Sequence, residues 1–249
     1  MDLRVAVLNK LAMAAIALTL AMSAGARAQS AAPVDVSVQV KDALQTCFQC
    51  HGPGGVSVIP TRPTIAGQKA EYIRRQLVAF KNSATKSPRK AGLDGGEAKK
   101  SPGTALRRDP VMEHMAAGLP DHLLAPLAQA VSQLVCNAKP DKVQLTKPPA
   151  LPPRRPAAAQ ACVVCHGEDG IGVQNQVPNL AGQQRSYLRR QLLLLRETAW
   201  GARPREGEAW RSHPIMEAKA ARLKITDIDA IAQYYTALDC QGAGRQSVQ

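Results

Sequence analysis

Aromatic residues are scarce in this 249-residue chain, at 3% of the sequence, with two Trp, four Tyr and two Phe. A domain of about a hundred residues normally fills its core with more bulky apolar side chains than this composition supplies. The shortage therefore argues against a core built from side chains alone. It indicates that a large non-protein group occupies part of the interior.

Acidic residues are also few, with 19 Asp and Glu against 32 Lys and Arg, which gives a formal net charge of +13. Such an excess favours acidic protein partners or peripheral contact with an anionic membrane surface. Nucleic acid is the other usual partner of a basic chain. The low aromatic content and the export signal described next argue against nucleic acid.

Long apolar runs are missing after the first thirty or so residues, so we expect no membrane span in the rest of the chain. At the N-terminus, Arg4 and Lys10 flank an apolar run from Leu11 to Leu20, and Ala26-Arg27-Ala28 forms a small-x-small cleavage site. This order is typical of a secretory signal peptide. We therefore predict that residues 1–28 are removed on export, with an uncleaved anchor as the alternative.

A five-residue motif, Cys-x-x-Cys-His, occurs twice, at residues 47–51 and 162–166. On a helical turn the two cysteines face the same way, so both thiols can bond one porphyrin while the histidine binds its iron. The motif is the attachment signature of a c-type haem. The sequence therefore predicts two covalent haems c, with thioethers from Cys47, Cys50, Cys162 and Cys165, and axial iron ligands from His51 and His166.

Two other interpretations of these cysteines are weaker. Paired Cys-x-x-Cys motifs can form one zinc site, but here the pairs lie 115 residues apart and each is followed by histidine. A thioredoxin-like redox pair needs a preceding strand, and neither copy has strand-like sequence before it. Haem also explains the aromatic shortage, since a porphyrin would fill the core.

The sequence around the motifs repeats as well. Residues 63–77 and 178–192 agree at nine of fifteen positions, at the same offset of 115 residues as the haem motifs. Farther on, Pro110-Val-Met-Glu aligns with Pro214-Ile-Met-Glu at an offset of 104. We predict two copies of one domain, a first module at 34–139 and a second at 157–244, joined by a proline-rich linker at 140–156.

Both modules are predicted to be all-α, because their apolar residues recur at helical spacing and no alternating strand pattern is evident. Thr226 is the predicted N-cap of the last helix. The segment 81–110 is predicted to be a basic surface loop. The expected helices cover residues 36–49, 69–81, 121–136, 158–165, 185–198 and 226–238.

Met112 and Met216 are the candidate second axial ligands. They align across the repeat, each follows a proline by two residues, and they lie in sequence that we expect to be loop. A methionine is more often core filler, but a Met/His pair is a known haem ligation in cytochromes c. In the first module, His114 is expected at the surface and Met115 in packing. His213 is expected to contact a haem carboxylate or solvent.

Cys136 and Cys240 end the two modules at equivalent places. They could meet across a pseudo-twofold axis and form a disulfide, or remain free or pair between molecules. Tyr72 and Tyr187 also repeat, and each is expected to pack on haem or to hydrogen-bond near a haem carboxylate.

The two haem motifs, each followed by Pro-x-x-Ala-Gly-Gln…Tyr-x-x-x-Gln-Leu and then Pro-x-Met, resemble the cytochrome c4 family over nearly the whole mature chain. The resemblance implies two class I cytochrome c domains related by pseudo-twofold symmetry. It implies a periplasmic, non-enzymatic one-electron carrier towards a terminal oxidase or reductase. Met112 and Met216 would be the distal ligands. The first module is longer by eleven residues, so its haem is expected to be the odd one.

Two other functions stay open. One is a dihaem electron-accepting subunit of a dehydrogenase, such as a flavocytochrome sulfide dehydrogenase. The other is a dihaem peroxidase, which needs a haem with an open distal face. The two aligned methionines and the short chain argue against the peroxidase.

Overall fold

The structure of the chain, a computed structural model, describes residues 35–85, 106–137, 154–203, 205 and 207–241. Contacts divide the chain into two units, Met1–Asp35 and Val36–Gln249, and all of the elements described below belong to the second unit. The predicted signal peptide, most of the predicted linker and most of the predicted 81–110 loop lie outside the described residues. The exact domain boundaries therefore stay a prediction.

The first module is helical. Its elements are α2 (Val36–His51), the 3-10 turn η1 (Pro53–Gly55), α3 (Ala70–Thr85), α4 (Pro110–Ala117) and α5 (Asp121–Gln133). The first haem motif occupies the last turn of α2, as the sequence predicted. The apolar face of α5 is buried through Leu123, Leu124, Leu127 and Val131, which recur at helical spacing.

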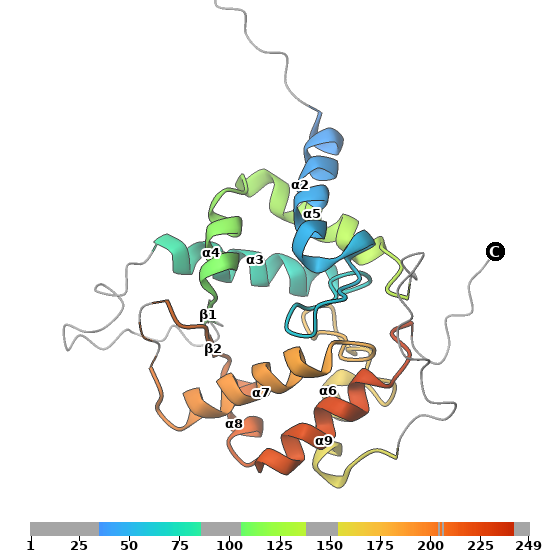
Figure 1. Cartoon of the computed structure of the whole chain (residues 1–249), viewed down its shortest axis with the longest axis vertical. Helices are drawn as coiled ribbons and strands as arrows, with labels where there is room; N and C mark the ends of the chain where they lie inside the picture. The colour runs from blue at the N-terminus through green and yellow to red at the C-terminus, as the bar shows by residue number, and fades with distance from the viewer. Residues whose placement is uncertain (1–34, 86–105, 138–153, 204, 206, 242–249) are drawn as a thin grey trace, which may run out of the picture. The chain divides into compact units, whose positions relative to one another are not determined.

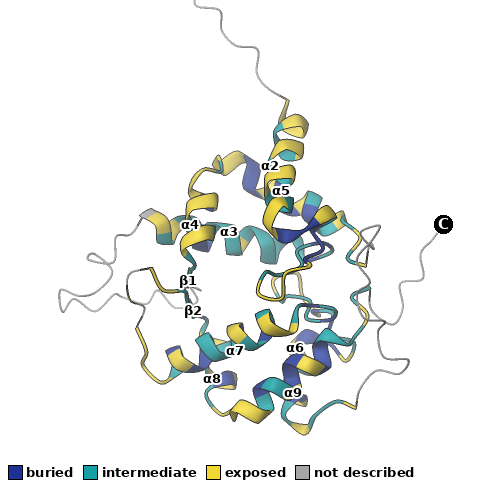
Figure 2. Cartoon of the chain, in the orientation of Figure 1, coloured by how far each residue is buried: buried dark blue, intermediate teal, exposed yellow. Residues whose placement is uncertain are grey.

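The second module repeats this order in shorter form. Its elements are η3 (Ala157–Ala159), α6 (Val163–His166), α7 (Arg185–Ala199), α8 (Pro214–Ala220) and α9 (Ile225–Thr236). The expected helix 158–165 is wrong in detail, because a 3-10 turn and a four-residue helix replace it. Figure 2 shows the buried positions of α9. The core of this module joins Ala159, Leu188, Ile231, Ala232, Tyr234 and Tyr235.

The last helix begins one residue earlier than the sequence suggested. Lys224 is the N-cap of α9, and the Asp227 carboxylate accepts a hydrogen bond from its backbone N–H at 2.9 Å. Thr226 is exposed within the first turn, so its prediction as the N-cap is wrong. Asp227 instead provides an acceptor for a backbone N–H group that has no partner within the helix.

Two three-residue strands join the modules, which corrects the prediction that the chain has no strand. Strand β1 (Leu106–Arg108) belongs to the first module and β2 (Trp210–Ser212) to the second, and they pair antiparallel. Figure 1 shows them meeting between α4 and α7. Each strand is too short to form alone, so only the partner from the other module makes it a strand.

Further contacts between the modules come in equivalent pairs. The backbone N–H of Tyr72 donates to Asn175 O at 3.2 Å, and that of Tyr187 donates to Pro60 O at 3.1 Å. Tyr187 repeats Tyr72, and Asn175 repeats Pro60, at the offset of 115 residues. This reciprocity is the pseudo-twofold relation expected of two tandem class I cytochrome c domains.

Glutamines form a second reciprocal set. Gln68 donates from Nε2 to Asn179 O at 3.0 Å and accepts from Asn179 N at 2.8 Å. Gln183 donates to Thr64 O and accepts from Thr64 N, both at 2.8 Å. Both glutamine side chains are buried, so four backbone groups are satisfied away from water.

Candidate haem sites

The histidines of the two motifs lie in matching environments. His51 Nδ1 is 2.8 Å from Pro63 O, and His166 Nδ1 is 2.9 Å from Pro178 O. A carbonyl oxygen can only accept, so Nδ1 carries the proton and Nε2 keeps a free lone pair. Both rings are buried, at 8% and 5% exposure. This is how a protein orients an imidazole that binds metal.

Burial lowers the pKa of His51 and of His166. The rings are therefore neutral near pH 7 and can coordinate iron through Nε2. The proline carbonyls come from the repeated Pro-x-x-Ala-Gly-Gln segments. The segments that orient the histidines are thus the same ones that bind the other module through Gln68 and Gln183.

The four cysteines of the motifs take no part in the disulfide, so their sulfur atoms are available to attach haem. Cys47 and Cys162 are half-buried, whereas Cys50 and Cys165 are exposed. Burial raises the pKa of the Cys47 and Cys162 thiols. In each module one thiol therefore lies inside the fold and one at its edge, next to a histidine whose Nε2 is available.

The methionines lie in helices, not in loops as the sequence suggested. Met112 is the third residue of α4 and Met216 the third residue of α8. Their backbone N–H groups donate to the side chains that cap these helices, Asp109 Oδ1 at 3.3 Å and His213 Nδ1 at 3.4 Å. Both methionine side chains are half-buried.

Two neighbours of the methionines differ from expectation. His213 is half-buried and caps α8 through Nδ1, so the expectation of plain solvent exposure is wrong, while the alternative of a haem-carboxylate contact stays a prediction. Asp109 has the same role before α4, which explains why two unlike residues occupy this aligned position. His114 is exposed, as predicted. The sequence predicts that Met115 packs against other residues, whereas the structure places it among the exposed apolar residues, at 37% exposure.

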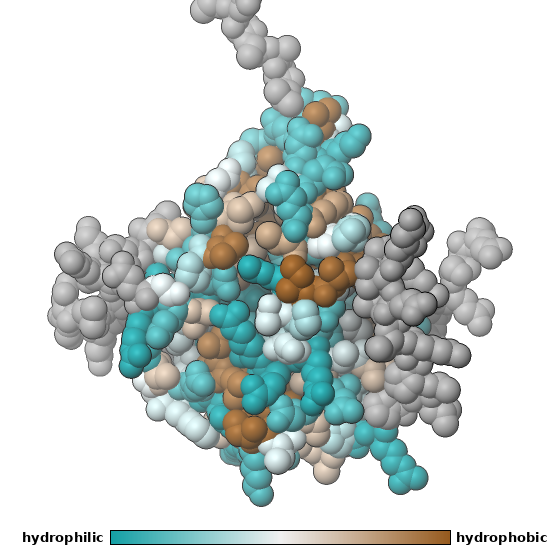
Figure 3. Space-filling model, viewed as in Figure 1, coloured by the Kyte–Doolittle hydropathy of each residue, from teal (hydrophilic) through white to brown (hydrophobic). Residues whose placement is uncertain are grey.

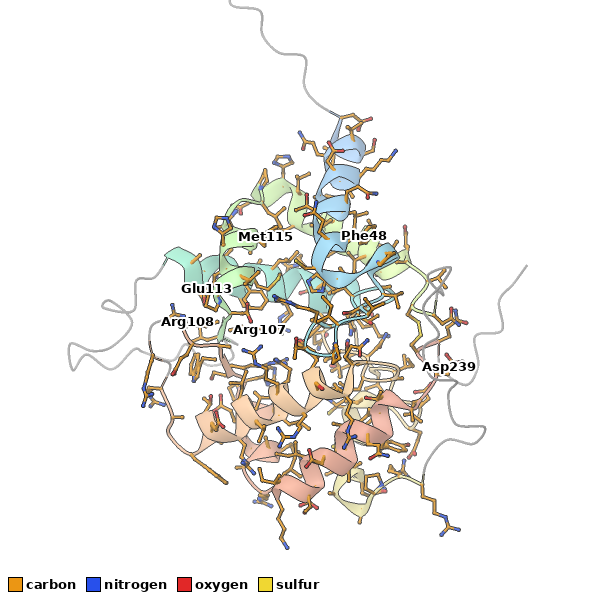
Figure 4. The ribbon with its side chains drawn as sticks, in the orientation of Figure 1. Phe48, Arg107, Arg108, Glu113, Met115 and Asp239 are labelled. Atoms are coloured by element: carbon orange, nitrogen blue, oxygen red, sulfur yellow. A yellow bond between two sulfur atoms is a disulfide. The ribbon has the colours of Figure 1, made fainter. Side chains whose placement is uncertain are left out.

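The described residues fit a porphyrin in each module. Exposed apolar side chains lie next to the candidate ligands, and Figure 3 shows apolar patches on the viewed surface. In the first module Val111 and Met115 flank Met112, and Figure 4 labels Met115 on α4 and Phe48 within the haem motif. In the second module, Val164 lies inside the motif at 76% exposure and Ile215 precedes Met216 at 62%.

Two buried polar atoms of the second module also fit the presence of a bound haem. Trp210 Nε1 and Tyr235 Oη have no hydrogen-bond partner among the described residues. A buried donor without a partner is costly. A haem brings two carboxylates and an iron into such a site, and a carboxylate is an acceptor for these donors.

Comparisons with known proteins agree with this geometry. The sequence model of the cytochrome c family matches residues 156–238, the second module. Cytochrome c4 of Azotobacter vinelandii is 31% identical over 196 residues, covering 77% of this chain and 84% of the relative. The chain belongs to the cytochrome c4 family.

Other relatives extend the comparison. The crystal structure of reduced recombinant cytochrome c4 from Pseudomonas stutzeri superposes with a TM-score of 0.57 at 25% identity, covering 82% of this chain and 99% of that one. A thiosulfate dehydrogenase electron acceptor of Stutzerimonas stutzeri (strain A1501) is 27% identical, covering 78% of this chain and 79% of its own length. The chain is a dihaem electron carrier with two covalent haems c.

The sequence also missed functional candidates. Arg107 and Arg211 lie at the centre of β1 and β2, and their side chains bond to Tyr187 and Tyr72 respectively. The arginines repeat at the offset of 104 residues that relates the two methionines. That shared offset is the signal that could have found them. The tyrosine hydroxyls reach these arginines across the module boundary, a contact that sequence reasoning did not anticipate.

Proposed function

We propose that this member of the cytochrome c4 family is a periplasmic one-electron carrier whose haems are each ligated by one histidine and one methionine. His51 and Met112 would bind the iron of the first module, and His166 and Met216 that of the second. Each haem supplies one reversible ferrous–ferric couple when bound. The matching Nδ1 hydrogen bonds of the two histidines are the observation that carries this assignment.

The residues support electron transfer rather than catalysis. Each histidine is oriented by a fixed carbonyl, and each methionine follows a capped helix start, so both ligands of a haem come from ordered backbone. Ligands held in this way need little rearrangement when the iron changes charge. With a methionine on each distal face, no position is left for a substrate, which disfavours a peroxidase.

The partner is proposed to be a redox protein with an acidic docking surface, either a terminal oxidase or reductase or a dehydrogenase. The formal net charge is +13 for the full chain and +11 without residues 1–28, and this excess favours acidic partners, whose association should weaken with salt. A dehydrogenase gains support from the similarity to a thiosulfate dehydrogenase electron acceptor. The export signal of residues 1–28 supports a periplasmic site. Among the described residues, no helix is long and apolar enough to cross a membrane.

The test is replacement of each methionine by alanine in the full holoprotein. Ferric haem bound to methionine has a weak far-red absorption band that arises from the iron–sulfur bond. We expect Met112→Ala and Met216→Ala each to remove about half of the intensity, because each removes one of two iron–sulfur bonds. Met115→Ala is the matched control in the same helix and should leave the band intact.

Two results would contradict the ligand assignment. A wild-type band that accounts for one haem would exclude one of the two methionines. Loss of the band in Met115→Ala with retention in Met112→Ala would move the ligand by one helical turn. The first result would favour an open haem and catalysis, whereas the second would keep a methionine ligand and only change its position.

A further inference from the structure

Arg196, in the last turn of α7, is a buried cation without a counter-ion. The residue is 9% exposed, and its Nη1 donates to Leu223 O at 3.3 Å. Its Nε is buried and has no hydrogen-bond partner among the described residues. No carboxylate in that part of the chain forms an ion pair with it. A buried guanidinium with unpaired donors is costly, so the site calls for an anionic group.

The first module supplies that anionic group itself. Lys81 is the counterpart of Arg196, at the offset of 115 residues. Its Nζ donates to Leu119 O at 2.5 Å and to Asp121 Oδ1 at 2.6 Å. Leu119 is the counterpart of Leu223 at the offset of 104 residues, so the two cations bind the same carbonyl of the repeated fold. The first module therefore adds a carboxylate that the second module lacks.

Exposed apolar side chains take the place of that carboxylate in the second module. Asp121 is the first residue of α5, and its counterpart Ile225 is the first residue of α9 and 43% exposed. Trp200, at 64% exposure, lies with its ring centroid 4.7 Å from Arg196 Cζ. Its indole Nε1 donates to Ala221 O at 3.3 Å, which fixes the ring over the guanidinium. Tryptophan and arginine together are typical of the centre of a protein–protein interface.

The surface around these side chains is basic. Lys219 in the last turn of α8, and Arg222 and Lys224 in the connection to α9, are all exposed. Glu197 follows Arg196 on α7 and is exposed too, but the two form no ion pair. Figure 1 shows α8 and α9 packed along α7, which brings these residues to one end of the second module. The positive charge favours an acidic partner at this end.

We propose that Arg196, Trp200 and Ile225 form a docking site for an acidic protein partner. An aspartate or glutamate of the partner binds the guanidinium and takes the place that Asp121 has in the first module. An apolar side chain beside that carboxylate covers the exposed indole and isoleucine. Arginine suits this role because its guanidinium binds carboxylates with charge-assisted hydrogen bonds. The proposal rests on the proposed carrier function, since it gives the redox partner a place to bind.

The site makes the two modules unequal in docking. Ala221, which accepts the indole hydrogen bond, is the C-cap of α8, and α8 carries Met216. A partner bound there lies against the second module. In the first module the equivalent cation is already paired with Asp121, so the same surface has no charge to offer a partner. The chain therefore has one such docking site, although its fold is duplicated.

The test uses a capped peptide that alternates aspartate with leucine, and a control peptide with asparagine in place of aspartate. Each is titrated into the ferrous, diamagnetic holoprotein at low ionic strength. The indole N–H signal of Trp200 reports binding in two-dimensional NMR, and its loss in Trp200→Thr identifies it. We expect a saturable shift with the aspartate peptide and a Kd about tenfold higher for the asparagine peptide, because a hydrogen bond to a charged group is the stronger kind.

Variants of the site separate specific docking from general charge. Arg196→Gln and Ile225→Asp should each raise the Kd of the aspartate peptide about tenfold, the second because it supplies an internal carboxylate as Asp121 does in the first module. Ile225→Asn adds no charge and should raise the Kd less than Ile225→Asp does. Arg185→Gln removes an exposed charge at the opposite end of α7 and is the control for Arg196→Gln. If Arg196→Gln fails to fold, Ile225→Asp keeps the arginine and still tests the site.

Several results would overturn the proposal. One is the absence of a saturable shift in the wild type, and another is an unchanged Kd in Ile225→Asp. Equal weakening by Arg185→Gln and Arg196→Gln would assign the binding to net charge alone. If vesicles of phosphatidylglycerol moved the indole signal while the aspartate peptide did not, the site would face a membrane instead. Failure of the carrier function would look different, because the methionine–iron band of the wild type would then be abnormal.

Discussion

Cys136 of the first module is disulfide-bonded to Cys240 of the second, with Cα atoms 6.2 Å apart and a sequence separation of 104 residues. The bond lies against the repeated Ala-Gly-Gln turns of both modules. A Cβ at Gly182 would lie 2.7 Å from Cys240 Cβ, and Gly182 has a φ of +69°. Glycine therefore lets the turn approach the bond. The disulfide closes the same interface that the glutamines and strands form.

Replacing both cysteines, as Cys136→Ser with Cys240→Ser, should lower stability by about 2–5 kcal/mol, because the bond restricts a long loop of the unfolded chain. The measurement is the urea midpoint of the holoprotein kept ferrous with ascorbate in every sample, with and without a thiol reductant. The double variant is preferred to either single one, since it leaves no unpaired thiol. A wild-type midpoint that does not respond to the reductant, together with an unchanged midpoint in the variant, would show that the interface holds without the bond.

Gln183→Ala and Gln68→Ala should each lower stability by about 1–3 kcal/mol, because each leaves two backbone groups of the other module without a partner. Both glutamines are buried, at 7% and 6% exposure. Gln129→Ala and Gln233→Ala are matched controls, since these glutamines also repeat but are exposed on α5 and α9. Denaturant midpoints of the four variants make the comparison. Equal losses in all four would mean that the reciprocal bonds contribute nothing specific.

Asp109→Ala and His213→Ala should each cost about 1 kcal/mol, because each removes the cap of a helix that carries a methionine. Both cap side chains accept the backbone N–H of that methionine, Met112 or Met216. Thermal unfolding, read from the methionine–iron band, tests the loss. The band should disappear at a lower temperature in the capping variants than in the wild type.

Thr226→Ala is the control for the capping prediction. The sequence predicts Thr226 as the N-cap, whereas the structure places it exposed in the first turn of α9. The Asp227 carboxylate instead accepts a hydrogen bond from the backbone N–H of Lys224. Its replacement should change stability by a few tenths of a kcal/mol at most. A loss as large as that of Asp109→Ala would restore Thr226 to the capping role.

Much of the haem chemistry could be predicted from local sequence. The Cys-x-x-Cys-His motifs need only one helical turn to bring two thiols and an imidazole together, so their spacing is enough. The helices followed from apolar spacing, and α3, α5 and α7 begin within one residue of the predicted positions. The methionines were found by alignment of the two modules, although the loop expected around them is helix.

The errors arose where the decisive partner is distant or where two local solutions compete. Thr226 and Asp227 can both satisfy the start of α9, and composition does not say which residue does so. The predicted helix 158–165 is broken because the shorter second module enters its haem motif through a 3-10 turn. Strands β1 and β2 were missed because three residues have no alternation to detect. Each becomes a strand only when the other supplies its hydrogen bonds.

The sequence by itself determined the cofactor, the duplication and the helical modules, because each depends on residues that lie close along the chain or repeat along it. Only the tertiary structure decided how the modules meet. It paired Cys136 with Cys240, set Arg107 opposite Arg211, and gave Tyr72 and Tyr187 partners in the opposite module. The physical reason is that a contact between residues about a hundred positions apart depends on how the surfaces of two folded modules fit together. Local sequence propensity does not specify that fit.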